Sequence, residues 1–421
     1  MKQESIFSCS CTLEKCRKEP LGPLQEGFCQ WLIDQGYARY TIRKHLFCVS
    51  HLNDYLANQG FSDYSHLSQR HIRTFLTEHF CKSKGGKKEQ AHHLRVTFSI
   101  NRFTKYLKEY SLVKDFSPCQ TSQSSLLDGY LQWLKDIQNS AQGTIELRRV
   151  YLSGFLASFD GSLSLERLAH VSPGEVQTFF LEYAKSHGKA SRRSMQAALR
   201  TFLRFCYTKG YVGRDLSVSV PTLRTYKLDT LPRSLTDCEI RKILFHIDLE
   251  TDTGRRDYAI IQLLYTYGIR GGQLRALRLD DIDWRQNQIR FSAMKHGKEI
   301  YLPLTDDVGE SLLSYLRYSR PSTSYKELFL TLRAPYQPLK YSTTLSEIIA
   351  KCMKSAGLEV ARCGSHAFRH SFATRMLASG HPLKSIADML GHRCIQTTAV
   401  YTKVDFQTLN RVPLDWPEVM S

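Results

Sequence analysis

The chain has 421 residues, more than one hydrophobic core usually organises, so several domains are expected. Apolar residues make up 42% and charged residues 23%, which is typical of a globular chain and not of a disordered one. Lys and Arg outnumber Asp and Glu by 58 to 40, and the resulting net charge is +18. The basic residues are spread along the chain, which favours a polyanionic partner, usually nucleic acid.

Apolar runs in the sequence are too short to cross a membrane. None approaches the roughly 20 residues that span a bilayer, and the first residues lack the apolar segment of a secretory leader. We therefore expect no membrane partner and a cytoplasmic location.

The cysteines fall into two groups. Most lie in apolar helical contexts, as Cys48, Cys206 and Cys352 do, and are expected to be reduced core residues. Four stand near the N-terminus: Cys9, Cys11, Cys16 and Cys29. Four thiols could bind zinc, but their spacing matches no paired-knuckle pattern and no histidine lies nearby. We expect a reduced terminal segment and no metal, with zinc as the alternative.

Polar, turn-rich joints at residues 117–122 and 217–221 divide the chain. The sequence predicts a cysteine-containing segment over 1–20, a helical first block over 21–116 and a helical second block over 122–215. A third block follows over 230–414, and a short tail covers 415–421.

The first two blocks are similar enough to indicate a degenerate repeat. Thr41-Ile42 and Thr144-Ile145 each open a predicted amphipathic helix whose apolar residues recur at spacings of three and four. The predicted apolar faces are Leu46, Val49, Leu52 and Leu56 in the first helix, and Leu147, Val150, Leu152, Phe155 and Phe159 in the second. Later elements repeat the pattern: Ile72, Phe75 and Leu76 correspond to Val176, Phe179 and Phe180, and Ile100, Phe103, Tyr106 and Leu107 to Leu199, Phe202, Phe205 and Cys206.

Each of these blocks is predicted to hold about four helices with basic residues along them. They are Arg43, Lys44, Arg95, Arg102 and Lys105 in the first block, and Arg148, Arg149, Arg192, Arg193, Arg200 and Arg204 in the second. Charged positions of this kind can be plain solvated helix faces. Two consecutive basic domains can also clamp the phosphates of a nucleic acid.

The third block mixes helices with a hairpin. Residues 258–267 form an apolar helix that Gly268 ends, and residues 288–294 and 299–304 alternate as two strands around His296-Gly297. Ser365 is expected to cap a helix to about residue 379, Pro382 to begin the next, and a last helix to contain Tyr401. The predicted fold class is therefore multidomain and mainly α, with a small β-hairpin sheet in the third block.

Six residues of this block could act together: Arg270, Lys295, His366, Arg369, His392 and Tyr401. Each alone has a structural explanation, such as an arginine that caps carbonyls or a tyrosine in a core. His366 and Arg369, however, share one helical face near a helix N-terminus, where a phosphate is favoured. From its turn, Arg270 is expected to reach out of the domain, and arginine forks match phosphate oxygens.

These residues stand in motifs that resemble those of the tyrosine recombinases, or phage integrase family. Residues 267–274, Tyr-Gly-Ile-Arg-Gly-Gly-Gln-Leu, are similar to the family's first arginine motif, and residues 366–370 resemble its H-x-x-R-H box. Leu-Gly-His at 390–392, followed by Tyr401, resembles the final motif, and the hairpin around Lys295 the catalytic-lysine hairpin. One departure is Gln273, where family members often carry an acidic residue.

The resemblance implies the chemistry of a DNA recombinase. Tyr401 would attack a phosphodiester, form a 3′-phosphotyrosyl link and release a 5′-hydroxyl, and the reverse attack by another strand would rejoin the DNA without metal, cofactor or ATP. Arg270, Arg369 and His392 would stabilise the developing charge. The implied partners are double-stranded DNA and further copies of the chain in a tetrameric synapse, as in the integrases and transposases of mobile elements.

Proton transfer is assigned to three other residues. Lys295 would be the general acid for the leaving oxygen, with Lys298 as its rival near the same turn. His366 would carry the proton of Tyr401, whose phenol has a pKa of about 10 when unperturbed. His370 is expected to be structural.

Other classes of function are weighed against this interpretation. The chain could be a DNA-binding regulator that keeps an idle recombinase fold, although all six residues are present. It could also be a type IB topoisomerase or a telomere resolvase. A metal-dependent nuclease is disfavoured, because the cluster of Asp280, Asp281 and Asp283 follows a helix and is expected to be its solvated end.

Overall fold

A computed structural model describes residues 17–64, 67–79, 87–113, 122–159, 165–223, 234–293, 299–358 and 364–391. Several residues of interest lie outside these ranges: Cys9, Cys11, Cys16, Lys295, Lys298, His392 and Tyr401. The chain divides into two compact units, one made of Met1–Lys114 with Leu228–Ser421 and the other of Asp115–Lys227. The finer domain bounds given above stay a prediction.

The first block is helical, as expected. Its elements are α2 (Gly22–Asp34), α3 (Arg39–Asn58), α4 (Gln69–Thr74), a π-helical turn η2 (Phe75–His79) and α5 (Lys87–Glu109). The predicted apolar positions of α3 and α5 are all buried. Cys29 is also buried, on α2, where it follows Phe28, whose ring packs against Phe103 of α5 at a centroid distance of 5.2 Å.

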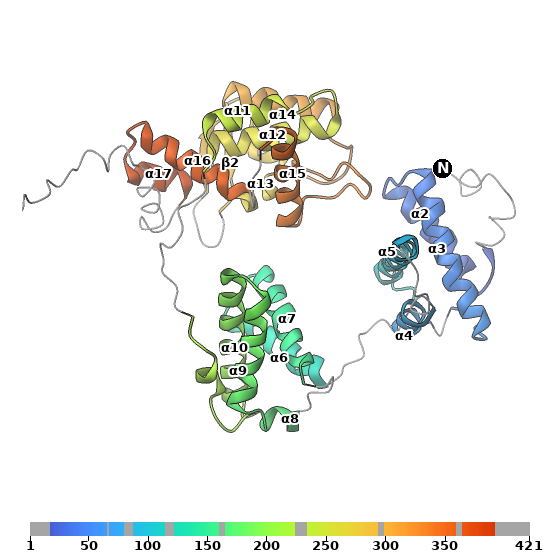
Figure 1. Ribbon diagram of the computed structural model, residues 1–421. Coiled ribbons are helices and arrows are strands. Elements are labelled where there is room, and N and C mark those ends of the chain that lie inside the picture. Colours follow the sequence, from blue (N-terminus) through green and yellow to red (C-terminus); the bar gives the residue numbers. More distant parts are fainter. Residues whose placement is uncertain are drawn as a thin grey trace, which may run out of the picture. The chain divides into compact units, whose positions relative to one another are not determined.

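The second block repeats this plan. It contains α6 (Ser122–Asp136), α7 (Gln142–Ala157), α8 (Leu165–Ala169), α9 (Pro173–Ser186), α10 (Lys189–Thr208) and a short 3-10 turn, η3 (Leu216–Ser219). Figure 1 shows α6, α7, α9 and α10 packed together, with α8 at one end of the group. Its core includes Tyr130, Phe155, Phe180 and Phe202, all essentially inaccessible to solvent.

One prediction for α7 was wrong. Leu147 and Val150 were assigned to its buried face, but they are 46% and 68% exposed. With 3.6 residues per turn, both point away from the side that carries Ile145 and Leu152, which are buried. The second block therefore leaves apolar side chains on the outer face of α7.

The third block surrounds helix α12 (Asp252–Tyr267), which is buried along most of its length. Around it lie α11 (Asp237–Phe245), α13 (Gly271–Ala276), α14 (Asp306–Tyr318), α15 (Ser342–Ser355) and α16 (Ser365–Ala378), and α17 (Leu383–Leu390) packs against α16. Packing is closest between α12 and its neighbours α14 and α16. None of the helices within the described ranges is both long enough and apolar enough to span a membrane.

The predicted hairpin is confirmed and gains a third strand. The antiparallel sheet has the order β1-β2-β3, with β1 at Ile282–Asp283, β2 at Gln288–Phe291 and β3 at Ile300–Pro303. In its register Ile289 of β2 faces Ile282 of β1 and Leu302 of β3. The multidomain, mainly α fold with a small sheet is therefore as expected.

The acidic cluster is only partly the solvated segment that the sequence predicts, because Asp280 and Asp283 are exposed and Asp281 is not. It begins in a 3-10 turn, η4 (Leu279–Asp281), and Asp281 is buried. Its Oδ1 accepts hydrogen bonds from Arg290 Nε at 2.9 Å and Nη2 at 2.6 Å, and its Oδ2 accepts one from the Arg278 amide at 2.8 Å. The turn directs this carboxylate towards β2, where the arginine compensates its charge.

Candidate active site

Two glycines bring the predicted arginine turn against helix α16. Gly268 ends α12 in the left-handed conformation at φ 57°, as predicted, and the chain then turns into α13 with Arg270 as its N-cap. A methyl group added at Gly271 would lie only 2.5 Å from Ser365 Oγ. Glycine therefore favours this close approach of α13 to the start of α16, the helix that carries His366 and Arg369, because any larger residue would displace neighbouring side chains.

The start of α16 differs from the prediction in one detail. Gly364 is the N-cap residue, and Ser365 is the first residue of the helix. The side chain of Ser365 is therefore not the expected cap. Pro382 caps α17, which ends before Gly391 as predicted, with Gly391 left-handed at φ 63°.

Arg270 and Arg369 meet at the C-terminus of α17. Arg369 is 4% exposed, and it donates from Nη1 to the Gly268 carbonyl at 3.0 Å and from Nη2 to the Leu390 carbonyl at 2.7 Å. Arg270 donates from Nη1 to the same Leu390 oxygen and from Nη2 to the Gly391 carbonyl, both at 3.2 Å. The two guanidinium groups are thus held by one set of backbone oxygens.

The expectation that Arg270 reaches out of the domain was therefore wrong. The last carbonyls of a helix have no partner within it, and the helix dipole makes this end partly negative. Both effects attract a guanidinium group, and α17 places its end within reach of Arg270. The result is a fixed pair of cations and not two independent surface arginines.

His366 is one residue into α16 and keeps access to solvent. Neighbouring protein nevertheless displaces part of the water around its ring, which lowers its pKa below the usual value. The positive charges of Arg369 and then Arg270 lower the pKa further. The imidazole is therefore neutral near pH 7, the form that can accept a proton. His370 is partly buried on the same helix, and its structural role stays a prediction.

Lys295, His392 and Tyr401 lie outside the described residues, but the chain beside two of them is placed. Strand β3 begins at Ile300, five positions after Lys295. A methyl group added at Gly391, the residue before His392, would lie 2.9 Å from Ile300 Cδ1 and 3.7 Å from Arg270 Nη1. The base of the hairpin, the end of α17 and the arginine turn therefore converge.

Gln273 has a role that the sequence did not reveal. It is buried; its Oε1 accepts a hydrogen bond from the Arg270 amide at 3.1 Å, and its Nε2 donates to the Ser292 carbonyl at 3.3 Å. This side chain thus links the arginine turn to the chain just after β2. The only signal in the sequence was a polar residue three positions after the arginine.

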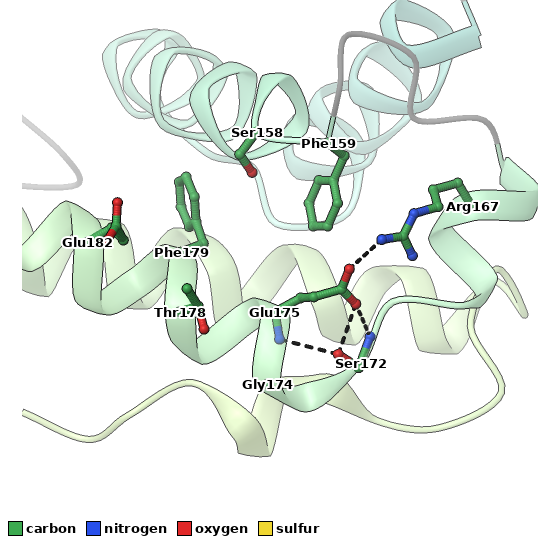
Figure 2. A pocket seen from close by; sticks show the side chains of 9 residues that line it. All are labelled: Ser158, Phe159, Arg167, Ser172, Gly174, Glu175, Thr178, Phe179 and Glu182. Carbon is green, nitrogen blue, oxygen red and sulfur yellow. Dashed lines mark hydrogen bonds and ion pairs between the residues drawn. The ribbon is translucent and has the colours of Figure 1, made fainter.

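Outside this convergence, a hollow of about 880 Å³ lies in the second block, between the ends of α7, α8 and α9. Figure 2 shows that Glu175 stands at its edge between Arg167 and Ser172. Glu175 accepts hydrogen bonds from the amide and the hydroxyl of Ser172, each at 2.8 Å, and it pairs with Arg167. These polar groups complete the capping box of α9, which is a structural role.

Within the described ranges, no three His, Cys, Asp or Glu side chains gather as a metal ion would require. Of the four cysteines considered as zinc ligands, Cys29 lies buried on α2, and the other three lie outside those ranges.

Comparison with known proteins indicates the same family as these motifs. The model of the phage integrase family matches residues 233–408. The integrase/recombinase y4rA of Sinorhizobium fredii is 31% identical over 393 residues, which cover 93% of each chain. The tyrosine recombinase XerC of Oceanobacillus iheyensis is 31% identical over 66% of this chain and 91% of its own.

Solved structures show the same fold. The recombinase XerH, bound to a palindromic difH substrate, matches with a TM-score of 0.52 at 20% identity over 81% of this chain and 93% of its own. A λ integrase dimer (75–356) bound to a COC′ core site matches with a TM-score of 0.52 at 18% identity over 66% and 94%. The chain belongs to the phage integrase family, the tyrosine recombinases, which are DNA strand-cleaving and rejoining enzymes.

Proposed function

We propose that this recombinase cuts and rejoins duplex DNA at specific sites with Tyr401 as its nucleophile. The phenolic oxygen bonds to the phosphorus of a phosphodiester, and the bond from phosphorus to the 5′ oxygen breaks. The 5′ oxygen leaves as a hydroxyl after it takes a proton. Attack by the 5′-hydroxyl of another strand reverses these steps and releases the tyrosine, so the energy of the bond is conserved without ATP.

The observation that carries this proposal is the convergence of Arg270 and Arg369 at the end of α17, with His366 of α16 close enough for both charges to act on it. A phosphate at this place would meet two guanidinium groups whose orientation the backbone already fixes. Donors held in place in this way stabilise charge that develops on the non-bridging oxygens without reorganising during the reaction. We assign this role to Arg270 and Arg369, together with His392.

Proton transfer completes the assignment. Lys295 would protonate the leaving 5′ oxygen, and Lys298 is the rival for this role. His366 would accept the proton of Tyr401, because its lowered pKa keeps the ring neutral near pH 7. These steps use no metal, so cleavage is expected to continue in the presence of EDTA.

The assembly and the location are proposed from the relatives. The solved structures include a λ integrase tetramer on a Holliday junction as well as the DNA complexes above. We propose that this chain likewise works as a tetramer on two duplexes, within the cytoplasm, as the recombinase of a mobile element.

A nicked duplex that carries the DNA next to this protein's gene tests the proposal. Cleavage beside the nick releases a short fragment, so rejoining fails and the covalent complex accumulates. A protein–DNA band that survives denaturation supports the proposal. DNA binding without such a band would instead indicate a regulator with an idle recombinase fold.

A further inference from the structure

Tyr267 is the last residue of α12, and its hydroxyl lies where β3 ends and α14 begins. The hydroxyl donates a hydrogen bond to the Pro303 carbonyl at 2.7 Å and accepts one from the Thr305 amide at 3.3 Å. Pro303 is the last residue of β3, and Thr305 is the N-cap of α14. One side chain thus joins the start of the arginine turn to the second strand of the hairpin.

The ring of Tyr267 contacts the other strand of the hairpin. Its centroid lies 5.5 Å from that of Phe291, the last residue of β2. Both side chains are buried. In the antiparallel register Phe291 pairs with Ile300, and Pro303 pairs with Gln288. Tyr267 therefore contacts the hairpin at both ends of its paired length.

The hydroxyl of Tyr267 is a stable donor. Burial raises the pKa of this phenol, and the hydrogen bond from Thr305 lowers it by less. The phenol therefore keeps its proton near pH 7 and donates it to the Pro303 carbonyl. Because its two hydrogen bonds are made inside the protein, this hydroxyl serves the packing of the hairpin and not nucleophilic attack.

Gln273 makes a second link between the same two parts of the chain. Tyr267 and Gln273 stand three positions before and three positions after Arg270, and Gln273 donates to the Ser292 carbonyl at 3.3 Å. Both sides of the arginine turn are therefore bonded to the hairpin. Lys295 follows Ser292 by three positions, and the fixed spacing of successive Cα atoms means that the place of Ser292 limits where this lysine can reach.

We propose that Tyr267 is a positioning residue for protonation of the leaving 5′ oxygen, because it sets the place of the hairpin relative to the arginine turn. This inference rests on the proposed function, and it holds whichever of Lys295 and Lys298 is the general acid. The arginines act on the non-bridging oxygens, whereas the hairpin acts on the bridging 5′ oxygen. A general acid must lie within hydrogen-bond reach of the atom that it protonates, so a displaced hairpin affects the leaving group alone.

Two substrates that differ in one atom separate this role from a general effect on the fold. Tyr267→Phe removes the hydroxyl and keeps the ring. Full-length proteins in excess are mixed with the nicked duplex described above, which carries either the ordinary 5′ oxygen or a bridging sulfur at the scissile bond. The sulfur leaves as a thiolate and needs no proton. The rate of covalent complex formation is measured, and thermal unfolding confirms that each variant is folded.

Tyr315 offers a matched control. It is a buried tyrosine of α14, and its hydroxyl accepts a hydrogen bond from the Leu330 amide at 3.3 Å. Tyr315→Phe therefore removes a comparable buried hydrogen bond that does not involve the hairpin. Phe291→Leu is a second test variant, because it removes the ring contact and leaves the two hydrogen bonds of Tyr267 in place.

Tyr267→Phe is expected to react roughly 10- to 100-fold more slowly than the wild type with the ordinary duplex, and at the wild-type rate with the sulfur duplex. Phe291→Leu should show the same dependence on the substrate, and Tyr315→Phe should match the wild type on both. Equal slowing of Tyr267→Phe on both substrates, or wild-type rates on both, would overturn the positioning role and leave the proposed function intact. Wild-type protein that forms no covalent complex with either duplex would overturn both.

Discussion

Arg270 and Arg369 donate hydrogen bonds to the same backbone oxygen, that of Leu390, at 3.2 and 2.7 Å. Residues from two distant motifs thus share an acceptor that is the first residue of the third motif, two positions before His392. The geometry of the proposed phosphate site depends on the end of α17 as much as on the arginine side chains. A change at Arg270, at Arg369 or at the end of α17 is therefore expected to alter the geometry of the other two.

Arg270→Lys tests whether the fork of the arginine, beyond its charge, is needed. Lysine keeps the charge but cannot donate to Leu390 and Gly391 in the bidentate manner of a guanidinium. Strand cleavage is expected to fall roughly 100- to 1000-fold, the usual effect of losing one transition-state donor, with little change in DNA affinity. Arg317→Lys, at an exposed position of α14, is the control. Equal losses of affinity and cleavage would make Arg270 an ordinary phosphate contact.

Gly271→Ala tests the close approach of α13 and α16. Its new methyl group would overlap Ser365 Oγ and the Leu345 side chain, so these side chains or the helices that carry them must shift, at a cost of about 1–3 kcal/mol in unfolding free energy. Cleavage should fall as Arg270 moves from His366. Gly154→Ala, on α7 with open space around it, should be neutral or slightly stabilising. Wild-type cleavage by Gly271→Ala would show that this contact does not position the site.

Much of the fold follows from local rules in the sequence. Apolar spacing on α3 and α5, the glycines at 268 and 391, and the strand alternation around residue 296 each depend on near neighbours. The errors have equally local causes. Leu147 and Val150 are apolar, but they fall on the exposed side of α7, which the spacing alone does not separate from the buried side. The burial of Asp281 depends on its partner Arg290, which lies on β2.

The site was only partly predictable. Motifs identify which side chains act together, and they correctly led to Arg270, His366 and Arg369 as neighbours. They say nothing of backbone acceptors, because the Leu390 carbonyl has no side-chain signature. The two bonds of Gln273 also depend on the tertiary position of Ser292, which no spacing in the sequence encodes. The roles of Lys295, His392 and Tyr401 stay predictions.

Gln273→Glu tests the residue at which this chain departs from its family. Glutamate keeps an acceptor for the Arg270 amide but loses the donor to the Ser292 carbonyl. A buried acceptor facing another acceptor is expected to cost about 1–3 kcal/mol of stability, measured by denaturant unfolding, and to lower cleavage. If this variant is as stable and as active as the wild type, the link between the arginine turn and the hairpin is unimportant.

His366 gives a prediction for pH. Because its folded-state pKa is below the usual value of about 6.5, the unfolded chain binds the proton more readily. The free energy of unfolding therefore decreases as the pH falls from the usual pKa towards the folded-state pKa of His366. Above the usual pKa, this residue does not change the free energy of unfolding. An NMR titration of the ring should give a midpoint below 6.5, and Arg270→Met should raise it part of the way, since displaced water and Arg369 remain. A midpoint above the usual value would contradict this electrostatic account.

The general acid can be identified with a modified substrate. Lys295→Ala should slow cleavage of ordinary DNA, because the 5′ oxygen then leaves without a proton. A bridging sulfur at that position leaves as a thiolate and needs no proton, so it should restore the rate of this variant. Lys298→Ala is the matched comparison. Rescue of Lys298→Ala and not of Lys295→Ala would transfer the role to Lys298.

Peptide mapping can show directly whether Tyr401 becomes covalently joined to DNA. The complex trapped on a nicked duplex is digested with nuclease and protease, and the peptide that carries the remaining nucleotide is identified by mass spectrometry. The nucleotide is expected on Tyr401, and Tyr401→Phe is expected to bind the duplex without forming an adduct. A nucleotide on another residue, or an adduct formed by Tyr401→Phe, would contradict the account.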